Sequence, residues 1–373
     1  MIPKKTELVK PMYKRILIPI FIITSHFVFG QAPKYSNEFL SIGVGARALA
    51  MGNSVIASTN DASSGYWNPA GLTLLQTDFD AGLMHAEYFA GIAKYDYMGA
   101  AMKLDSVQWI SASIIRFGVD DIPNTTDLID KEGNIDYDRI SKFSAADYAF
   151  LFSYARKSQI QGLSYGANIK VVYRNIGKFA HSWGFGLDAG AQFKHNRWSY
   201  GIVLRDITST FNAWTFNEEE LIIKVLDTTY NYAPDNSLEI TLPRLLMGIS
   251  REFPVYNKFT GLAEIDLDIT FDGKRHVLIE GDPISIDPHL GIEINYNKLA
   301  FIRFGVGNFQ QVVEFDNTES MTFQPNFGIG IQFKGFSIDY ALTDLGDNSL
   351  ALYSNIFSVR YSFNQKKSSK GNT

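Results

Sequence analysis

The chain has 373 residues, a net charge of −5, a hydrophobic fraction of 46% and a charged fraction of 20%, which is ordinary for a folded protein. The small negative charge gives no sign of a nucleic-acid partner. The absence of cysteine excludes disulfides, thiolate metal sites and a cysteine nucleophile.

The first 30 residues predict a secretory signal peptide. A Lys-Arg pair precedes an apolar run of about 15 residues, which is short for a helix that needs about 20 residues to span a membrane. Val28 and Gly30 occupy the −3 and −1 positions of a small-residue cleavage site. The mature chain is therefore expected to begin near Gln31, with Met12 as an alternative start.

Residues 31–76 do not alternate between polar and apolar, and they predict a helical or irregular plug. The run 43–52 consists mostly of small residues, which allow backbones to approach closely. A wide barrel needs such a segment to fill its lumen. The two glycines at the start of this run do not continue into a nucleotide-binding fingerprint, and no βαβ unit surrounds them.

The motif Asn68-Pro69-Ala70-Gly71 is expected to form a tight turn between the plug and the first strand. Pro69 fixes its own φ and keeps Asn68 out of helical geometry. Gly71 permits a bend with positive φ.

From residue 77 to residue 363, apolar residues recur with a period of two. In 163–174 and 182–194, for example, apolar side chains alternate with polar or glycine residues, apart from Val172. Such alternation predicts strands with one apolar and one polar face. The candidate strands are 77–88, 93–104, 107–118, 144–157, 162–175, 182–194, 197–206, 239–252, 257–270, 285–297, 298–307, 322–334, 335–343 and 350–363.

An even number of alternating segments of roughly ten residues is the signature of a membrane barrel. The predicted fold class is an all-β transmembrane barrel of about 14 antiparallel strands with an N-terminal plug, followed by a polar tail over 364–373. Long connections at 119–143, 207–238 and 271–284 are expected to alternate with short turns that face the periplasm. A soluble sandwich is the alternative, but it seldom contains so many strands with aromatics along each one.

The polar face of the strands is expected to line the lumen. Acids of one strand could bind calcium, but a lumen balanced by Lys170, Arg174, Arg205 and Arg303 is the preferred interpretation. The predicted lumen-facing residues are Lys170, Arg174, Asp188, Glu264, Asp266, Asp268, Glu293 and Arg303.

No catalytic constellation is found in the sequence. The five histidines of the mature chain form no metal-binding pattern, so we expect neither an enzyme nor a cofactor. The connection 207–238 is rich in aromatics, which favours either contact with a partner outside the membrane or packing over the barrel mouth. The candidate partner-contact residues are Phe211, Trp214, Phe216, Tyr230 and Tyr232.

Residues 45–72 resemble a known family. Gly-Ala-Arg-Ala-x-x-Met-Gly at 45–52, Asp-Ala-Ser at 61–63 and Asn-Pro-Ala-Gly-Leu at 68–72 resemble the N-terminal signature of FadL-type outer-membrane barrels. The form of residues 66–72 is most similar to the PorV/PorQ branch of Bacteroidetes.

The resemblance implies a plugged 14-stranded barrel in the outer membrane, in contact with its lipid. It further implies an accessory role in type IX secretion, in which the barrel contacts a large translocon barrel or the C-terminal signals of cargo. Other FadL-type members conduct hydrophobic small molecules, and the sequence does not separate these two functions.

Overall fold

The computed structural model describes residues 36–130, 133–225, 228–231, 237–313, 318–343 and 353–364.

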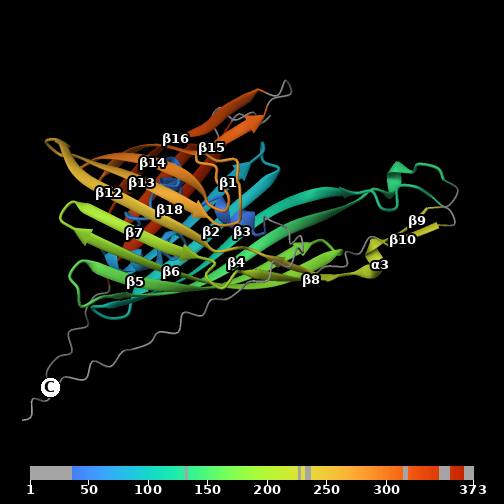
Figure 1. Ribbon diagram of the computed structural model, residues 1–373, viewed down its shortest axis with the longest axis horizontal. Helices are drawn as coiled ribbons and strands as arrows, with labels where there is room; N and C mark the ends of the chain where they lie inside the picture. The colour runs from blue at the N-terminus through green and yellow to red at the C-terminus, as the bar shows by residue number, and fades with distance from the viewer. Residues whose placement is uncertain are drawn as a thin grey trace, which may run out of the picture. The chain divides into compact units, whose positions relative to one another are not determined.

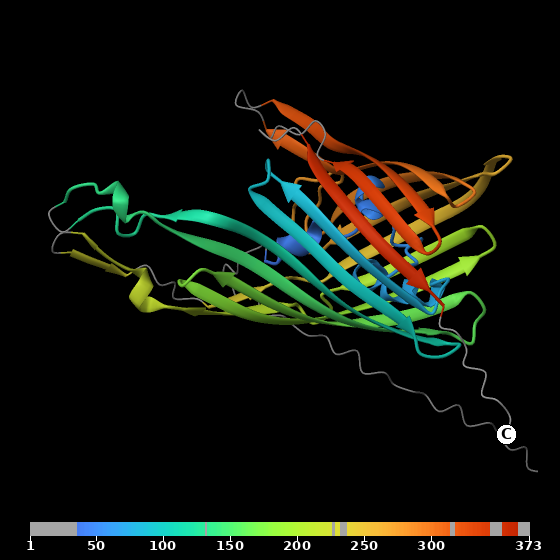
Figure 2. The same cartoon turned by 180° about the vertical axis from the view of Figure 1, so that it is seen from behind.

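Fourteen of the described strands form a closed antiparallel barrel, in which the first and last strands pair with each other (Figures 1 and 2). These strands are β1 (Phe79–Tyr88), β2 (Ala93–Lys103), β3 (Gln108–Asn124), β4 (Ser141–Lys157), β5 (Leu163–Ile176), β6 (Ala180–His195), β7 (Trp198–Arg205), β12 (Arg244–Tyr256), β13 (Phe259–Thr270), β14 (Ser285–Tyr296), β15 (Ala300–Val313), β16 (Glu319–Phe333), β17 (Phe336–Thr343) and β18 (Ser354–Phe363). β7 pairs with both β6 and β12. The predicted fold class and strand number are confirmed.

Tight hairpin turns gather at one end of the barrel. Asn196 joins β6 to β7 with φ 55°, Asn257 joins β12 to β13 with φ 49°, and Gly335 lies between β16 and β17 with φ 87°. Two-residue hairpins need positive φ to match the twist of their strands, and Asn and Gly adopt it at low cost. We call this end the short-turn end.

The opposite end, which we call the long-loop end, carries the long connections 125–140, 206–243 and 271–284. Its connections 89–92 and 177–179 are short, so the expected alternation of lengths does not hold throughout. The first of them closes tightly because Phe89, Ala90 and Gly91 all have positive φ.

The segment 207–238 is not a simple loop, contrary to the prediction. It contains β8 (Phe211–Phe216), α3 (Glu218–Leu221), β9 (Ile222–Val225), β10 (Thr228–Asn231) and β11 (Leu238–Ile240). Because β7 ends at Arg205, the first residues of β6 lose their partner, and β8 pairs with them instead. An unpaired strand edge is unfavourable, which explains why this segment extends the wall.

The outward face of the barrel is apolar. Phe327, Ile329, Ile331 and Phe333 of β16 all point outward and are 49–66% exposed. A continuous band of such residues suits lipid rather than water. No helix in the described part of the chain is long and apolar enough to cross a membrane.

Residues 36–75 lie inside the ring of strands and form the plug. Its elements are η1 (Glu38–Ser41), α1 (Ala46–Ala50), α2 (Ser64–Trp67) and η2 (Pro69–Leu74). Asn212 of β8 donates hydrogen bonds to the side chains of Ser36 and Asn37, which places the start of the plug at the long-loop end. The N–H of Ala62 bonds to Asp80 near the start of β1, so the plug descends through the lumen toward the short-turn end.

Candidate functional site in the plugged lumen

Glycines on the inner wall make room for the plug. A Cβ at Gly201 would overlap the carbonyl oxygen of Ile56, and one at Gly305 would overlap the backbone of Met51 and Gly52. We call the positions whose Cβ would collide with the plug the glycine seat. It consists of Gly166, Gly190, Gly201, Gly248, Gly291, Gly305 and Gly328. The wall therefore contacts the backbone of the plug directly.

The predicted turn motif is the beginning of a 3₁₀ helix. Asn68 has φ −153°, as a residue before proline prefers, and its Oδ1 accepts the N–H of Ala70 at 3.2 Å. Its Nδ2 donates to Ile56 O at 3.0 Å and to Ala191 O of β6 at 3.1 Å. The prediction of a simple turn was therefore wrong, although Asn68 does cap the backbone.

The role expected for Gly71 also differs. Its φ is not positive. It is small because a Cβ would overlap the carbonyl oxygen of Thr59, so close packing rather than a bend requires glycine there.

The eight predicted lumen residues all lie on inner faces of the strands. Lys170 contacts Asp188 at 3.2 Å and Asp206 at 2.5 Å, and all three side chains are buried. Arg174 of β5 contacts Asp147 at 3.0 Å. Asp268 of β13 contacts Arg244 at 3.3 Å. These ion pairs connect neighbouring or nearby parts of the wall.

The expectation that basic lumen residues balance Glu264 and Asp266 does not hold. Neither contacts Lys170, Arg174, Arg205 or Arg303. Their carboxylates accept backbone N–H groups of plug residues 56–58 instead. The partners of these two acids therefore come from the plug rather than from basic residues of the wall.

Sequence reasoning missed the cation through which the plug itself binds the wall. Arg47 is the one charged residue of the run 43–52, and its Nε lies 3.0 Å from Glu293 of β14. Glu293 also contacts Arg303 at 2.7 Å, and Arg303 contacts Asp339 of β17 at 2.6 Å. Burial by itself lowers the pKa of Arg47, but Glu293 and Asp61 raise it overall.

Asp61 is the second charged anchor of the plug. Its Oδ2 lies 2.9 Å from Arg360 of β18. Burial alone would raise the pKa of Asp61, but Arg360, Ser63 and Arg47 more than offset it, so the pKa lies below its usual range. Arg47 and Asp61 therefore give the plug a cation and an anion that are each paired with an opposite charge of the wall.

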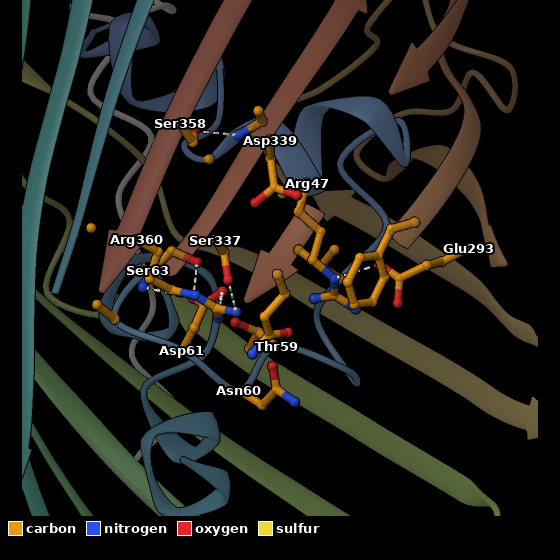
Figure 3. Close-up of a pocket in the computed structure, with 18 of the residues that line it drawn as sticks. Arg47, Thr59, Asn60, Asp61, Ser63, Glu293, Ser337, Asp339, Ser358 and Arg360 are labelled. Carbon is orange, nitrogen blue, oxygen red and sulfur yellow. Dashed lines mark hydrogen bonds and ion pairs between the residues drawn. The ribbon is translucent and has the colours of Figure 1, made fainter. Parts of the chain in front are cut away.

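A cavity of about 340 Å³ lies beside these anchors, toward the short-turn end (Figure 3). Figure 3 shows Arg47 and Asp61 of the plug with Glu293, Asp339 and Arg360 of the wall, all of which line this space. Its lining combines these charged groups with apolar side chains such as Met84, Tyr97 and Leu262.

The inner wall carries aromatic rings near the long-loop end. The rings of Tyr88 and Tyr95 lie 6.4 Å apart, and those of Tyr95 and Phe117 lie 6.1 Å apart. Trp214 and Phe216 stack at 6.1 Å, and the guanidinium of Arg174 lies 5.1 Å from the Trp214 ring. We call Tyr88, Tyr95, Phe117, Trp214 and Phe216 the aromatic wall.

This arrangement corrects the prediction for the partner-contact residues. Trp214 and Phe216 follow the alternation of Asn212, which bonds the plug, and therefore face inward. Phe211 faces outward and is 42% exposed. The side chain of Tyr230 in β10 is not described, and Tyr232 lies outside the described residues.

Acidic and histidine side chains do not cluster into a metal site. Within the residues that the structure describes, no group of three or more His, Asp or Glu could hold a metal ion.

No protein-family model and no curated protein matches the sequence. Among solved structures, the chain is similar to the Pseudomonas putida toluene transporter TodX, with a TM-score of 0.55, 13% identity, and 87% of this chain and 99% of that chain covered. It is also similar to the Ralstonia pickettii toluene transporter TbuX, with a TM-score of 0.54, 13% identity, and 86% of this chain and 98% of that chain covered. The corresponding values for the CymD monoaromatic hydrocarbon channel are 0.53, 14%, 87% and 98%. The chain therefore shares the fold of these three barrels.

Proposed function

We propose that this chain is an outer-membrane conduit for hydrophobic small molecules, closed at rest by its N-terminal plug. Residues 1–30 would be the signal peptide, 31–76 the plug, 77–363 the barrel and 364–373 the tail. The chain shares its fold with a toluene transporter and a monoaromatic hydrocarbon channel. The observation that carries the proposal is the aromatic wall.

An apolar wall at the long-loop end gives a hydrophobic molecule a place to leave water. Tyr95 is fully buried, while Tyr88 and Phe117 are half-buried. The rings of Tyr88 and Phe117 are therefore held in place but remain partly accessible. Rigid aromatic surfaces bind apolar molecules with little loss of side-chain entropy. Below them the plug fills the lumen, so passage requires the plug to shift.

The test is uptake of radiolabelled toluene by cells that lack a transporter of their own. Cells that make this protein should take up toluene faster than cells without it. Phe117→Asn should slow uptake, because it puts an amide into the aromatic wall. The matched control is Tyr173→Asn, since Tyr173 packs on Trp183 on the outer face of the barrel. Equal uptake with and without the protein would reject the proposal.

A second candidate is the accessory role in type IX secretion that the motif at 45–72 suggests. One observation favours it: β3 and β4, each of 17 residues, run past the other strands of the ring (Figure 1). Such an extension offers a surface for protein contact. Recovery of a large barrel or of secreted cargo with the protein from native membranes would support this role, and recovery of neither would remove it.

A further inference from the structure

Two buried acids of β13 hold the central part of the plug. Oδ2 of Asp266 accepts the N–H of Ile56 at 2.9 Å. Oε1 of Glu264 accepts the N–H of Ala57 at 2.6 Å and that of Ser58 at 3.2 Å. Three successive backbone groups of the plug are thus bound by one strand. These are among the hydrogen bonds that would have to break if this segment left the wall.

The pair lacks the positive charge that the neighbouring acids have. Glu264 is 1% and Asp266 is 2% exposed. In the described part of the chain, no Lys, Arg or His nitrogen lies within ion-pair distance of either. Asp188, Glu293 and Asp339, which also face the lumen, each contact a Lys or Arg. Two buried, uncompensated charges side by side would be strongly unfavourable.

The surrounding charged groups are already engaged. On the plug, Arg47 contacts Glu293. On β14, His289 lies beside Asp266 in the register, but its Nδ1 is bonded to Gly52 O at 2.8 Å and its Nε2 lies 3.7 Å from Asp287. On β13 itself, Asp268 is paired with Arg244 of β12. None of these groups neutralises the pair directly.

Each carboxyl group has one oxygen left over. Oε2 of Glu264 and Oδ1 of Asp266 are buried and receive no hydrogen bond from any donor in the structure. The two side chains are two residues apart on β13 and point to the same face, so their carboxyl groups are neighbours in the lumen. A single proton between them would satisfy both oxygens and remove one charge.

We propose that Glu264 and Asp266 share one proton, and that this protonated pair is a latch that holds plug residues 56–58 on the wall. With the proton, one carboxyl donates to the other while both still accept from the plug. Without it, two adjacent charges repel each other. The latch then loosens as pH rises. The inference concerns the plug and does not depend on what passes through the barrel.

Infrared difference spectroscopy of the barrel in lipid at pH 7 tests the shared proton. Ordinary solvated carboxyls, with pKa values near ~4, are ionised at that pH. Subtracting the spectrum of Glu264→Gln or of Asp266→Asn from that of the wild type should reveal the carbonyl stretch of a protonated carboxyl. In each variant an amide N–H replaces the proton and the remaining acid is ionised. Asp339→Asn, whose acid contacts Arg303, should reveal carboxylate bands alone.

Carboxylate bands alone in both test spectra would overturn the proposal, whether the pair is fully ionised or holds a metal cation. Each variant should still migrate faster on a gel unboiled than boiled, which shows that its barrel is assembled. Because both substitutions are nearly isosteric, either one suffices if the other fails to assemble.

Hydrogen exchange of residues 56–58 tests the latch itself. After correction for the intrinsic effect of pH, exchange in the wild type should speed up by roughly tenfold or more between pH 7 and pH 10, which is the effect of losing one hydrogen bond to a charged group. Glu264→Gln should remove that acceleration, because an amide cannot lose the proton. Equal pH dependence in the wild type and in Glu264→Gln would contradict the latch.

Discussion

The cost of a charge on the outer face should depend on its height in the membrane. Ile265 lies about six residue steps beyond Phe259, the first residue of β13. At ~3.3 Å per residue and a strand tilt of ~40°, this is about 15 Å above the short-turn end. Phe185 lies about ten steps from His195 at the other end of β6, or roughly 25 Å by the same reasoning. The apolar band of such barrels is about 25 Å tall.

Ile265 therefore lies near the middle of the band and Phe185 near its far edge, although both are exposed on the outer face. Ile265→Arg should cost about 2–4 kcal/mol of folding free energy, and Phe185→Arg about 0–1 kcal/mol. Reversible denaturant unfolding in lipid vesicles measures both values. Equal costs, or a larger cost for Phe185→Arg, would refute the height and face assignments.

Three further predictions concern the plug and the mouth. Gly201→Ala should displace residues 56–58, at about 1–3 kcal/mol, and speed their hydrogen exchange. Gly82→Ala should not, because a Cβ there would make only an ordinary contact with the carbonyl oxygen of Val359 at 3.9 Å. The pKa of Asp61 is lowered in the folded protein. Its pairing with Arg360 therefore stabilises the plug fully above pH ~4, and this stabilisation is lost as the pH falls through the lower, folded pKa. Proteolysis of residues 59–63 should thus increase at acid pH in the wild type, whereas Asp61→Asn should already be sensitive at pH 7. Trp214→Ala with Phe216→Ala should reduce toluene uptake, while Phe211→Ala, on the outer face of the same strand, should leave it unchanged.

The barrel could be predicted from the sequence because its signal is local. An alternation such as that of 182–194 shows which face of the strand contacts lipid and which faces the lumen. Each strand can therefore be predicted from its own residues alone, without reference to its neighbours. The tight turns at Asn196 and Asn257 are equally local. All fourteen ring strands were therefore expected within a few residues, and β3, β4 and β15 were longer than expected because their outer ends lose the apolar alternation.

Contacts of the plug left no such signal. Arg47 and Glu293 are 246 positions apart, and nothing in either neighbourhood indicates that they meet. β8 was missed because it forms only to cover the part of β6 that the short β7 leaves unpaired. Glu264 and Asp266 were expected to face the lumen, but the backbone groups that they bind belong to a segment whose path through the lumen has no sequence periodicity.

Locking the plug in place tests the central claim most directly. The hydroxyl oxygens of Thr73 in the plug and Ser164 in β5 lie 2.7 Å apart, close enough for an introduced disulfide, and the chain has no cysteine of its own. In cells that make the variant with Thr73→Cys and Ser164→Cys, toluene uptake should fall to the level of cells without the protein after oxidation and recover after reduction. Rapid, protein-dependent uptake through the fully oxidised variant would contradict a conduit gated by its plug.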